Sequence, residues 1–585
     1  MYKVFENEYD RNFSFFFEKL ARSTLMTDRL TIALAQLNPI VGKIDFNLNR
    51  LREVRASAAK AGADLVVTSE LYSCGYPPED LVRKPLFISE ITAAIEALAQ
   101  ETGDGGPALL VGAPWVEEDR LHNSQVLLDQ GQIIAARHKY DLPNYGVFDE
   151  KRIFDPGPLP GPINFRDVRI GVPICEDIWT PDVVECIAET GGEILLVPNG
   201  SPFETGKSDM RIHHAVARVV ESGLPLVYLN QIGGQDELVF DGGSFVMNPD
   251  RNLAWQLPAW REDLAITHWR RSGNTWNCQL GKTCNIEKDL AATYQAMTVG
   301  LRDYVNKNGF PGVILGMSGG IDSAISAAVA VDALGAERVH CVMMPSPYTS
   351  QESLDDAASA SEMLGVKLDT VSIAPAMEAF DKMLEQQFKG LESGITEENI
   401  QSRSRGLTLM ALSNKMGSMV LSTGNKSEMS VGYATLYGDM CGGYSVLKDV
   451  YKMTVFELSE WRNKNKPEGA LGPSGSVMPY RIITKPPSAE LKPDQVDQDT
   501  LPPYEALDAI LRGLIDEEAT VEEIAERGYQ FDTVMRIWKM LDRSEYKRRQ
   551  APPVLKLVIR LLVETDDTLS QMLSRQHINR SRDVE

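Results

Sequence analysis

What the chain has little of narrows the classes of protein to which it can belong. Its 585 residues include only seven cysteines, and no two of them form a CxxC pair. An odd number of cysteines spread so thinly argues against a disulfide scaffold or a zinc ribbon and predicts a reducing, cytoplasmic compartment. No apolar run approaches the ~20 residues that span a bilayer, so no membrane partner is expected.

Positive charge is also scarce. Lys and Arg total 59 against 82 Asp and Glu, which gives a net charge of −23. So acidic a surface repels a phosphate backbone, and nucleic acid is not an expected partner. The length is several times that of a usual domain, which predicts at least two hydrophobic cores.

Apolar strands alternate with amphipathic helices from Leu30 onward, a rhythm that predicts α/β architecture. The rhythm breaks near residue 275 and resumes with a helix near Glu287, where a second unit with a doubly wound parallel sheet is expected. A stretch rich in Pro and Gly over 465–503 indicates a mobile loop. The expected divisions are an extension of uncertain role without a signal-peptide pattern, a first domain, a linker and a second domain, over 1–28, 29–275, 276–286 and 287–585.

Three polar residues follow apolar strands in the first domain. Glu70 lies in "VVTSELYSCGY", Lys139 in "RHKYDLPNYGVFDE" and Cys175 in "GVPICEDIW". A thiol becomes a useful nucleophile beside a base or a positive charge, which a carboxylate and an ammonium supply. A lone buried cysteine is more often part of a core, so the prediction depends on all three. Cys74 is a weaker candidate because it lacks the strand-then-acid context.

The three contexts together resemble the nitrilase superfamily of carbon–nitrogen hydrolases, and "LPNYGVFDE" and "VPICEDIW" resemble its glutaminase branch. The resemblance implies an αββα sandwich in which Glu70 is the general base, Cys175 attacks the glutamine amide and Lys139 stabilises the oxyanion. Glu150 is implied as an additional acidic residue. The implied glutamine-binding residues are Tyr145, Ser201 and Lys207.

The second domain carries a glycine-rich loop, "GMSGGIDSA" over 316–324, directly after the apolar run "PGVIL". Glycines let backbone N–H groups approach phosphate oxygens, and the helix that follows presents its positive end. A Walker loop would carry a lysine, whereas this chain has Ile321 and Asp322 there. Taken alone, the loop is equally well explained as a strand-to-helix turn.

The SGGxDS form resembles the pyrophosphate loop of ATP pyrophosphatases, enzymes with an adenine nucleotide alpha hydrolase-like sheet. The strings "ENIQSRSRG", "LSTGNKSEMSVGYATLYGD" and "SVLKDVYKMTVFEL" resemble NAD synthetases. With the first domain, residues 29 to about 560 resemble the glutamine-dependent NAD synthetase family. The resemblance implies a ligase that adenylates deamido-NAD with ATP, amidates it with ammonia from glutamine, and forms NAD, AMP, pyrophosphate and glutamate.

The same resemblance assigns site residues in the second domain. The implied ATP contacts are Gly316, Ser318, Gly319, Gly320, Asp322, Ser323 and Thr423. The implied deamido-NAD contacts are Asn399, Arg403, Glu428, Lys448, Asp449 and Lys547. Asp322 and Glu428 are the implied ligands of Mg²⁺, which prefers oxygen donors. The basic stretch "RSEYKRRQAPPVLK" around Lys547 is also explained by a solvated helix face or a nucleic-acid patch.

Two other functions stay open at this point. One is a different ATP-pyrophosphatase amidotransferase, such as a GMP or asparagine synthetase. The other is a sensor that binds glutamine and nucleotide without turnover. The family further implies a homo-oligomer, at least a dimer through the synthetase domain, and an enclosed path that keeps ammonia unprotonated.

Overall fold

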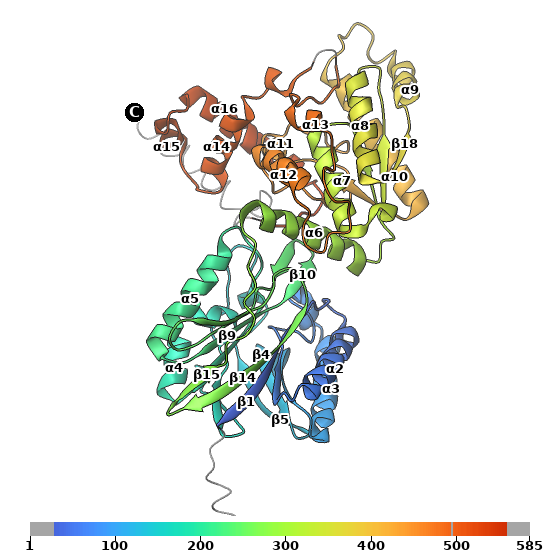
Figure 1. The fold of residues 1–585 in the computed structure, drawn as a ribbon. Coiled ribbons are helices and arrows are strands. Elements are labelled where there is room, and N and C mark those ends of the chain that lie inside the picture. The colour runs from blue at the N-terminus through green and yellow to red at the C-terminus, as the bar shows by residue number, and fades with distance from the viewer. Residues whose placement is uncertain (1–27, 493–494, 558–585) are drawn as a thin grey trace, which may run out of the picture. The chain divides into compact units, whose positions relative to one another are not determined.

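The computed structural model describes residues 28–492 and 495–557, drawn as a ribbon in Figure 1. The chain divides into two compact units. The first comprises the described residues up to Ser201 together with Asp209–Ile232 and Gly242–Ile286. The second begins at Glu287 and also takes in two short segments from the first half, Pro202–Ser208 and Gly233–Asp241. Within the described residues, no helix combines the length and apolar character needed to cross a membrane.

The first unit contains two mixed β-sheets. The strands of one sheet are β1 (Arg29–Gln36), β2 (Leu65–Val67), β3 (Ala108–Glu117), β4 (Arg120–Asp129), β5 (Gln132–His138), β14 (Asp263–Ser272) and β15 (Thr275–Cys278). They lie in the order β15-β14-β1-β2-β3-β4-β5. The strands of the other sheet are β6 (Ile163–Phe165), β7 (Val168–Gly171), β8 (Ile194–Asn199), β9 (Leu226–Asn230), β12 (Phe245–Met247) and β13 (Leu253–Gln256). Their order is β13-β12-β9-β8-β7-β6.

Alternating side chains decide how these sheets are layered. In β8, Ile194 and Leu196 join a core shared by both sheets, whereas Leu195 and Val197 pack toward helices on the outer face. This alternation is the period of two that a strand imposes. The outer helices are α4 (Asp182–Glu189) and α5 (Lys207–Ser222) on this sheet, and α2 (Ile44–Lys60) and α3 (Pro85–Glu101) on the other (Figure 1). The predicted αββα sandwich is thus confirmed.

The end of the first unit lies beyond the expected boundary at residue 275. β15 continues to Cys278 and pairs with β14. The expected linker then runs along β13, where the backbone N–H of Gly281 donates to Ala254 O and that of Cys284 to Gln256 O, both at 2.9 Å. These residues lack strand periodicity because their backbone partners come from a distant part of the chain.

The second unit is built on a five-stranded sheet. Its strands are β16 (Val313–Gly316), β17 (Val339–Met343), β18 (Lys367–Thr370), β19 (Met419–Ser422) and β20 (Tyr444–Ser445). Their order is β18-β17-β16-β19-β20, and all neighbours are parallel. The strand order reverses between β16 and β19, and ligands of such sheets bind beyond the carboxyl ends of strands at this reversal. The predicted doubly wound parallel sheet is confirmed.

Helices surround this sheet and extend the unit toward the C-terminus. They are α6 (Asp289–Lys307), α7 (Ile321–Leu334), α8 (Gln351–Leu364), α9 (Ala374–Leu384), α10 (Ile395–Met416), α11 (Lys426–Val431), α12 (Lys452–Lys464), α13 (Tyr480–Thr484), α14 (Tyr504–Ile515), α15 (Val521–Glu526), α16 (Phe531–Arg543) and α17 (Glu545–Arg548). The region predicted to be a mobile loop is mostly irregular. However, Val477, Met478 and Ile482 in it are no more than 1 % exposed, so this part packs as core rather than as a loose loop.

Candidate active sites

Cys175 lies at a sharp turn of the first unit. It opens a short 3-10 helix (Cys175–Ile178) after β7, is 6 % exposed, and has a φ of +49°. A non-glycine residue adopts this backbone only where its surroundings enforce it. Asp177 supplies that constraint, since its carboxylate accepts the backbone N–H groups of Ile174 (2.9 Å), Tyr140 (3.0 Å) and Asp141 (2.8 Å). The turn is thereby tied to the segment that follows Lys139.

A buried charge cluster surrounds Lys139, which directly follows β5. Lys139 Nζ lies 2.7 Å from Glu70 Oε1 and 2.9 Å from both carboxylate oxygens of Glu150. Glu70 is also held by Asn123 Nδ2 and by the backbone N–H of Gly200, each at 2.7 Å. Two carboxylates thus share one ammonium, and Glu70 has a fixed orientation. Buried charges need such partners, because an unpaired charge there is strongly destabilising.

The protonation states of this cluster follow from its burial. Burial raises the pKa of the Cys175 thiol well above its usual value, and the charge of Glu70 raises it further, while Lys139 opposes the shift. Burial alone lowers the pKa of Lys139, but Glu150 and Glu70 raise it well above its ordinary range. The resting site therefore holds a neutral thiol beside a permanent ammonium, and the thiol needs a base at the moment of attack.

Cys74, the rival nucleophile, lies in a different environment. It is fully buried, and its thiol donates to the carbonyl oxygens of Leu71 and Gly75, each at 3.4 Å. Burial raises its pKa without an opposing ammonium. This difference supports the sequence-based ranking of Cys175 above Cys74.

The three residues expected to bind glutamine lie in different environments. Tyr145 is 49 % exposed, and its hydroxyl donates to Glu176 Oε1 at 2.8 Å, next to Cys175 in the chain. Ser201 is buried, and its hydroxyl accepts a hydrogen bond from Arg211 Nε at 3.1 Å. Lys207 lies in the segment that clusters with the second unit, where its Nζ is 3.1 Å from Glu204 Oε1.

Sequence reasoning missed two buried partners of the cluster. Asn123 contacts Glu70 from the middle of β4, and Tyr76 OH donates to Glu150 Oε1 at 2.7 Å. The run "HNSQ" in β4 carried a usable signal, because four consecutive polar residues inside an otherwise apolar strand are unusual in a core. Tyr76 gives no comparable signal, since buried tyrosines are common.

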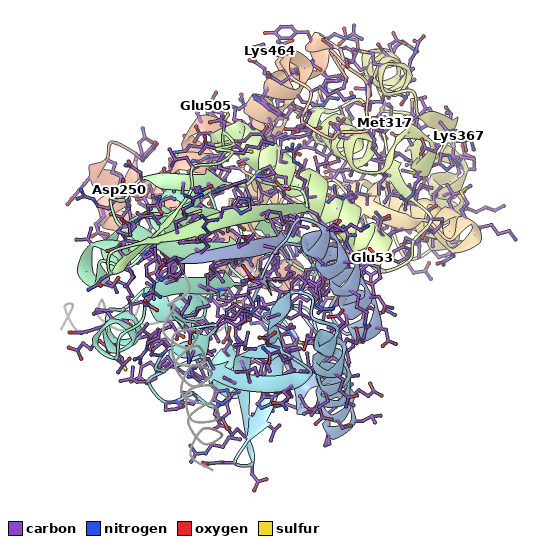
Figure 2. The ribbon with its side chains drawn as sticks, turned by 60° about the horizontal axis from the view of Figure 1, so that its bottom comes forward. Glu53, Asp250, Met317, Lys367, Lys464 and Glu505 are labelled. Carbon is purple, nitrogen blue, oxygen red and sulfur yellow. The ribbon has the colours of Figure 1, made fainter. Side chains whose placement is uncertain are left out.

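The glycine-rich loop of the second unit connects β16 to α7 at the reversal of strand order. Met317, which is labelled in Figure 2, follows β16 and is buried. Ser323 Oγ accepts the backbone N–H of Ser318 (3.2 Å), and Ser318 Oγ accepts that of Gly320 (3.2 Å). Gly319 has a φ of +80°, and a Cβ there would lie 2.1 Å from Ser353 O. The loop is thus compact, requires glycine, and precedes the positive end of a 14-residue helix.

Two carboxylates lie beyond the ends of β16 and β19. Asp322 Oδ1 accepts Asn425 Nδ2 at 2.9 Å, and Asp322 Oδ2 lies 2.5 Å from Lys452 Nζ. The same Nζ lies 3.0 Å from Glu428 Oε1. Burial raises the pKa of Glu428 to about 7. Thr423 directly follows β19 at this edge and is half-buried.

The residues present fit Mg²⁺. Asp322 and Glu428 already share one cation, the ammonium of Lys452, so a metal ion between them can reach both carboxylates. In the part of the chain that the structure describes, no group of three or more His, Cys, Asp and Glu side chains is arranged to hold a metal. Mg²⁺ commonly binds through one or two carboxylates plus substrate phosphates, which is the arrangement that these residues permit.

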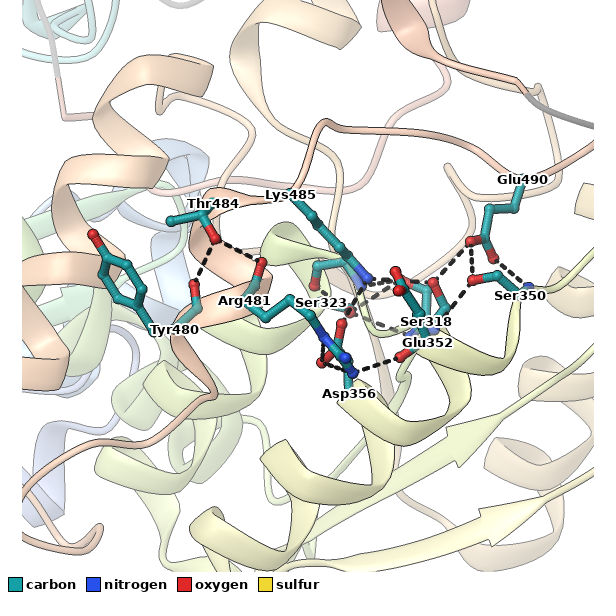
Figure 3. Close-up of polar contacts among 12 residues, drawn as sticks. Ser318, Ser323, Ser350, Glu352, Asp356, Tyr480, Arg481, Thr484, Lys485 and Glu490 are labelled. Atoms are coloured by element: carbon teal, nitrogen blue, oxygen red, sulfur yellow. Dashed lines mark hydrogen bonds and ion pairs between the residues drawn. The ribbon is translucent and has the colours of Figure 1, made fainter.

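Part of the stretch that the sequence predicted to be a mobile loop instead contacts the residues beside the phosphate loop, as Figure 3 shows. Lys485 Nζ lies 3.0 Å from Asp356 Oδ2 on α8. Glu490 Oε1 accepts the hydroxyls of Ser350 and Ser353, each at 2.8 Å. Because Gly319 packs against Ser353, residues 485–490 are linked through α8 to the loop.

Three of the expected deamido-NAD contacts gather around one loop. Asn399 Oδ1 accepts the hydroxyl of Thr435 at 2.9 Å, and Arg403 Nε donates to Leu436 O at 3.2 Å. Lys547 Nζ donates to the carbonyl oxygens of Gly432 (2.8 Å) and Ala434 (2.7 Å). Burial lowers the pKa of Lys547, and the charge of Arg403 lowers it further, as expected for two cations near each other.

Lys448 and Asp449 contact other parts of the chain. Lys448 is buried, and its Nζ donates to Pro552 O at 2.8 Å. Burial lowers its pKa to about 8. Asp449 is buried beside Lys426, with an oxygen 2.9 Å from Lys426 Nζ. In this structure both side chains have protein partners, and their role toward deamido-NAD stays a prediction.

Comparisons with known proteins cover both units. The family model for carbon-nitrogen hydrolases matches residues 31–273, and the model for NAD synthases matches residues 293–551. The glutamine-dependent NAD(+) synthetase of Rhodobacter capsulatus is 49 % identical over 535 residues, which are 92 % of this chain and 97 % of the relative. That of Acinetobacter baylyi is 43 % identical over 89 % of this chain and 94 % of the relative.

A solved structure agrees with these relatives. The glutamine-dependent NAD+ synthetase from Acinetobacter baumannii in complex with adenosine diphosphate superposes with a TM-score of 0.74 at 40 % identity. The match covers 92 % of this chain and 97 % of that one. The similarity therefore includes both halves of the sequence.

Proposed function

The chain belongs to the glutamine-dependent NAD(+) synthetase family, and on that premise we propose that it makes NAD from deamido-NAD, ATP and glutamine. The first unit releases ammonia from glutamine. The second unit adenylates the nicotinate carboxylate of deamido-NAD and replaces AMP by ammonia. The products are NAD, AMP, pyrophosphate and glutamate, so the enzyme is a carbon–nitrogen ligase.

Glutamine hydrolysis begins at the neutral thiol of Cys175. Glu70 takes the thiol proton as sulfur attacks the amide carbon, and Lys139 stabilises the negative charge that develops on the amide oxygen. Ammonia leaves as the thioester forms, and water then releases glutamate. Glu150 keeps Lys139 charged and in place, since both its oxygens lie 2.9 Å from Nζ. Tyr145, Ser201 and Lys207 are the proposed glutamine contacts.

The second unit activates a poor electrophile. A carboxylate repels nucleophiles, and its attack on the α-phosphate of ATP converts it to an adenylate with a good leaving group. The loop residues Gly316, Ser318, Gly319, Gly320 and Ser323, with Thr423, hold the ATP phosphates through backbone N–H groups and hydroxyls. Asp322 and Glu428 would hold Mg²⁺, which when bound would supply charge stabilisation for the pyrophosphate leaving group. Asn399, Arg403 and Lys547, together with Lys448 and Asp449, are the proposed deamido-NAD contacts.

The observation that carries the proposal is the buried contact of Lys139 with both Glu70 and Glu150 next to Cys175, in a chain that also carries the SGGIDS loop. We test it by incubating the enzyme with deamido-NAD, ATP, Mg²⁺ and glutamine and measuring NAD and AMP. Cys175→Ala is expected to lose NAD formation from glutamine and to keep it from ammonium salts.

The matched control is Cys74→Ala, which removes the thiol of the rival candidate and is expected to keep both activities. Loss of the glutamine reaction in the control rather than in Cys175→Ala would assign the nucleophile to Cys74. A wild-type enzyme that releases no AMP would instead support the sensor function.

Transfer of ammonia between the two reactions is part of the proposal. At neutral pH free ammonia is mostly ammonium, which has no lone pair for attack on the adenylate. Labelled glutamine in an excess of unlabelled ammonium is therefore expected to place most of its label in NAD. Dilution of the label in proportion to the bulk pool would show that ammonia passes through solvent.

We also propose that the enzyme is at least a dimer through its second unit. Leu407 and Met410 on α10 are 68 % and 37 % exposed, and Arg403 lies on the same helical face at the i, i+4 and i+7 spacing. An apolar face beside a proposed substrate contact is expected to be covered by another copy. Light scattering should give a mass above 64.8 kDa, and Leu407→Asp should lower it toward that value.

A cytoplasmic location is consistent with the thiol chemistry. Each of the seven cysteines, all within the described residues, is a free thiol. A reducing compartment preserves such thiols, including the one that the proposed glutaminase needs.

A further inference from the structure

Lys452 lies where the proposed metal ion would bind. Its Nζ is 2.5 Å from Asp322 Oδ2 and 3.0 Å from Glu428 Oε1, and the residue is 2 % exposed. The ammonium also lies 5.3 Å from the centre of the Tyr504 ring. Lys452 lies in the string "SVLKDVYKMTVFEL", but the sequence assigned it no role, and Asp322 is 130 positions away in the chain.

The location of Lys452 in its helix is unfavourable by itself. It is the first residue of the 13-residue helix α12, and its backbone N–H donates to Ser427 Oγ at 2.9 Å. A cation at a helix N-terminus is disfavoured by the helix dipole, and a buried lysine also loses rotamer freedom. The two carboxylates must offset both penalties, which indicates that the lysine is kept there for its charge.

The carboxylates in turn depend on a cation. Asp322 and Glu428 converge on the same Nζ, and a third carboxylate, Asp497, lies nearby and accepts Tyr504 OH at 2.9 Å. Without a positive charge these acidic side chains repel one another in a poorly solvated site. A divalent ion bound to both carboxylates would in turn repel the ammonium at such short range.

We propose that Lys452 is a positioning residue that holds Asp322 and Glu428 together until a divalent cation binds, and that the cation displaces its ammonium from both carboxylates. The proposal rests on the proposed function for the identity of the metal pair. Lys452 then sets how tightly the metal binds, because its charge competes with the metal for the same oxygens.

The test uses Lys452→Met in the full chain, which keeps side-chain length and removes the charge. Without metal, its second unit is expected to unfold at a lower temperature than the wild type. Mn²⁺ added without nucleotide should raise that temperature more than in the wild type. Free Mn²⁺, measured by electron paramagnetic resonance, should show binding tightened about tenfold once the competing charge is gone.

Two further variants make the result specific. Lys426→Met is the matched control, because Lys426 is another fully buried lysine whose Nζ contacts two carboxylates, Asp449 at 2.9 Å and Asp516 at 3.3 Å. It should lower the unfolding temperature without tightening Mn²⁺ binding. Lys452→Arg keeps the charge and should bind Mn²⁺ as the wild type does. If Lys452→Met does not fold, Lys452→Gln provides the same comparison.

Unchanged Mn²⁺ binding in Lys452→Met, or equal tightening in Lys426→Met, would overturn the proposal. The first result would show that the ammonium does not compete, and the second that any uncovered carboxylate pair binds the ion. Either outcome leaves the proposed function standing if the wild type makes NAD. A wild type without NAD synthesis refutes that function separately.

Discussion

At the residue scale, single buried charges have several partners each. Lys139 balances Glu70 and Glu150, so neither carboxylate can be changed without altering the charge felt by the other. Removing one member of a buried ion pair typically destabilises a protein by ~3–5 kcal/mol. Conservative substitutions are therefore needed to separate chemistry from folding.

Glu150→Gln is such a substitution. The amide keeps the shape and can still accept from Tyr76, but it removes a negative charge, so Glu70 has to neutralise Lys139 and is a weaker base. We expect NAD formation from glutamine to fall by roughly 10²-fold, while formation from ammonium stays unchanged. Steady-state rates with the two nitrogen sources measure this, and equal losses with both would place Glu150 outside glutamine hydrolysis.

Lys448 gives a pH dependence of stability. Burial lowers its pKa to about 8, below the usual 10.5, so between these values the unfolded chain binds more protons than the folded one. Folding is therefore stabilised as pH rises through this window. Lys448→Met removes this contribution, so the melting temperature of the wild type should rise relative to that of the variant between about pH 8 and pH 10.5. A pH-independent difference between the two proteins would show that the ammonium is not desolvated.

At the element scale, the phosphate loop is fixed by its packing against α8. Gly319 approaches the backbone of Ser353 so closely that even one methyl group has no room, whereas a Cβ at Gly320 would meet only Ser318 Oγ at 3.3 Å. The helix α8 also anchors Lys485 and Glu490. The loop and residues 485–490 thus contact the same helix.

Gly319→Ala is expected to abolish NAD and AMP formation with either nitrogen source, because the loop moves away from α8. Glutamine hydrolysis, measured as glutamate release, should remain because its residues are in the first unit. Gly320→Ala is the matched control, and it should retain substantial synthesis, since the hydroxyl of Ser318 can rotate. Comparable activity in the two variants would mean that the loop is not fixed by Ser353.

One buried arginine, Arg462, stabilises part of the stretch rich in Pro and Gly. Arg462 lies 2.6 Å and 3.0 Å from the oxygens of Asp332, and it also donates to the carbonyl oxygens of Pro473 (2.9 Å) and Gly475 (3.2 Å). Satisfied buried donors of this kind stabilise an irregular segment. The stretch rich in Pro and Gly is consequently held against α7 and α12 in this part.

At the scale of the whole molecule, neither compact unit is a single continuous stretch of the chain. The segment Gly233–Asp241 belongs to the second unit, where the backbone N–H of Gly234 donates to Asp303 Oδ2 at 2.8 Å and Lys307 Nζ to Gly234 O at 2.8 Å. The segment contains β11 (Leu238–Asp241) and part of β10 (Ile232–Gln235). The second unit is therefore incomplete when cut from the chain at residue 287.

A fragment of residues 287–585 should melt below the second unit of the full chain. Each lost hydrogen bond contributes ~1 kcal/mol, and 1 kcal/mol shifts the melting temperature by ~2–4 °C in a unit of this size. We expect a decrease of several degrees in differential scanning calorimetry, and a smaller one for Asp303→Ala in the full chain. Identical transitions in fragment and full chain would show that the two segments contribute no stability.

The sequence by itself determined what depends on local pattern. Strand and helix periodicity predicted two α/β units, and the resemblance of the strings around Glu70, Lys139, Cys175 and the SGGIDS loop to known families implied both reactions. These features are readable because each requires particular residue types at short spacing. Periodicity does not mark the residues after 275, because backbone partners in β14 and β13 hold them.

Only the tertiary structure decided which distant residues meet. It brought Asn123 to Glu70 and Lys452 to Asp322, and it buried Lys448 against Pro552. It also showed that two segments from the first half of the chain belong to the second unit. Such contacts depend on the order of the strands in each sheet and on the path of the connections between them. Short-range periodicity carries no information about either.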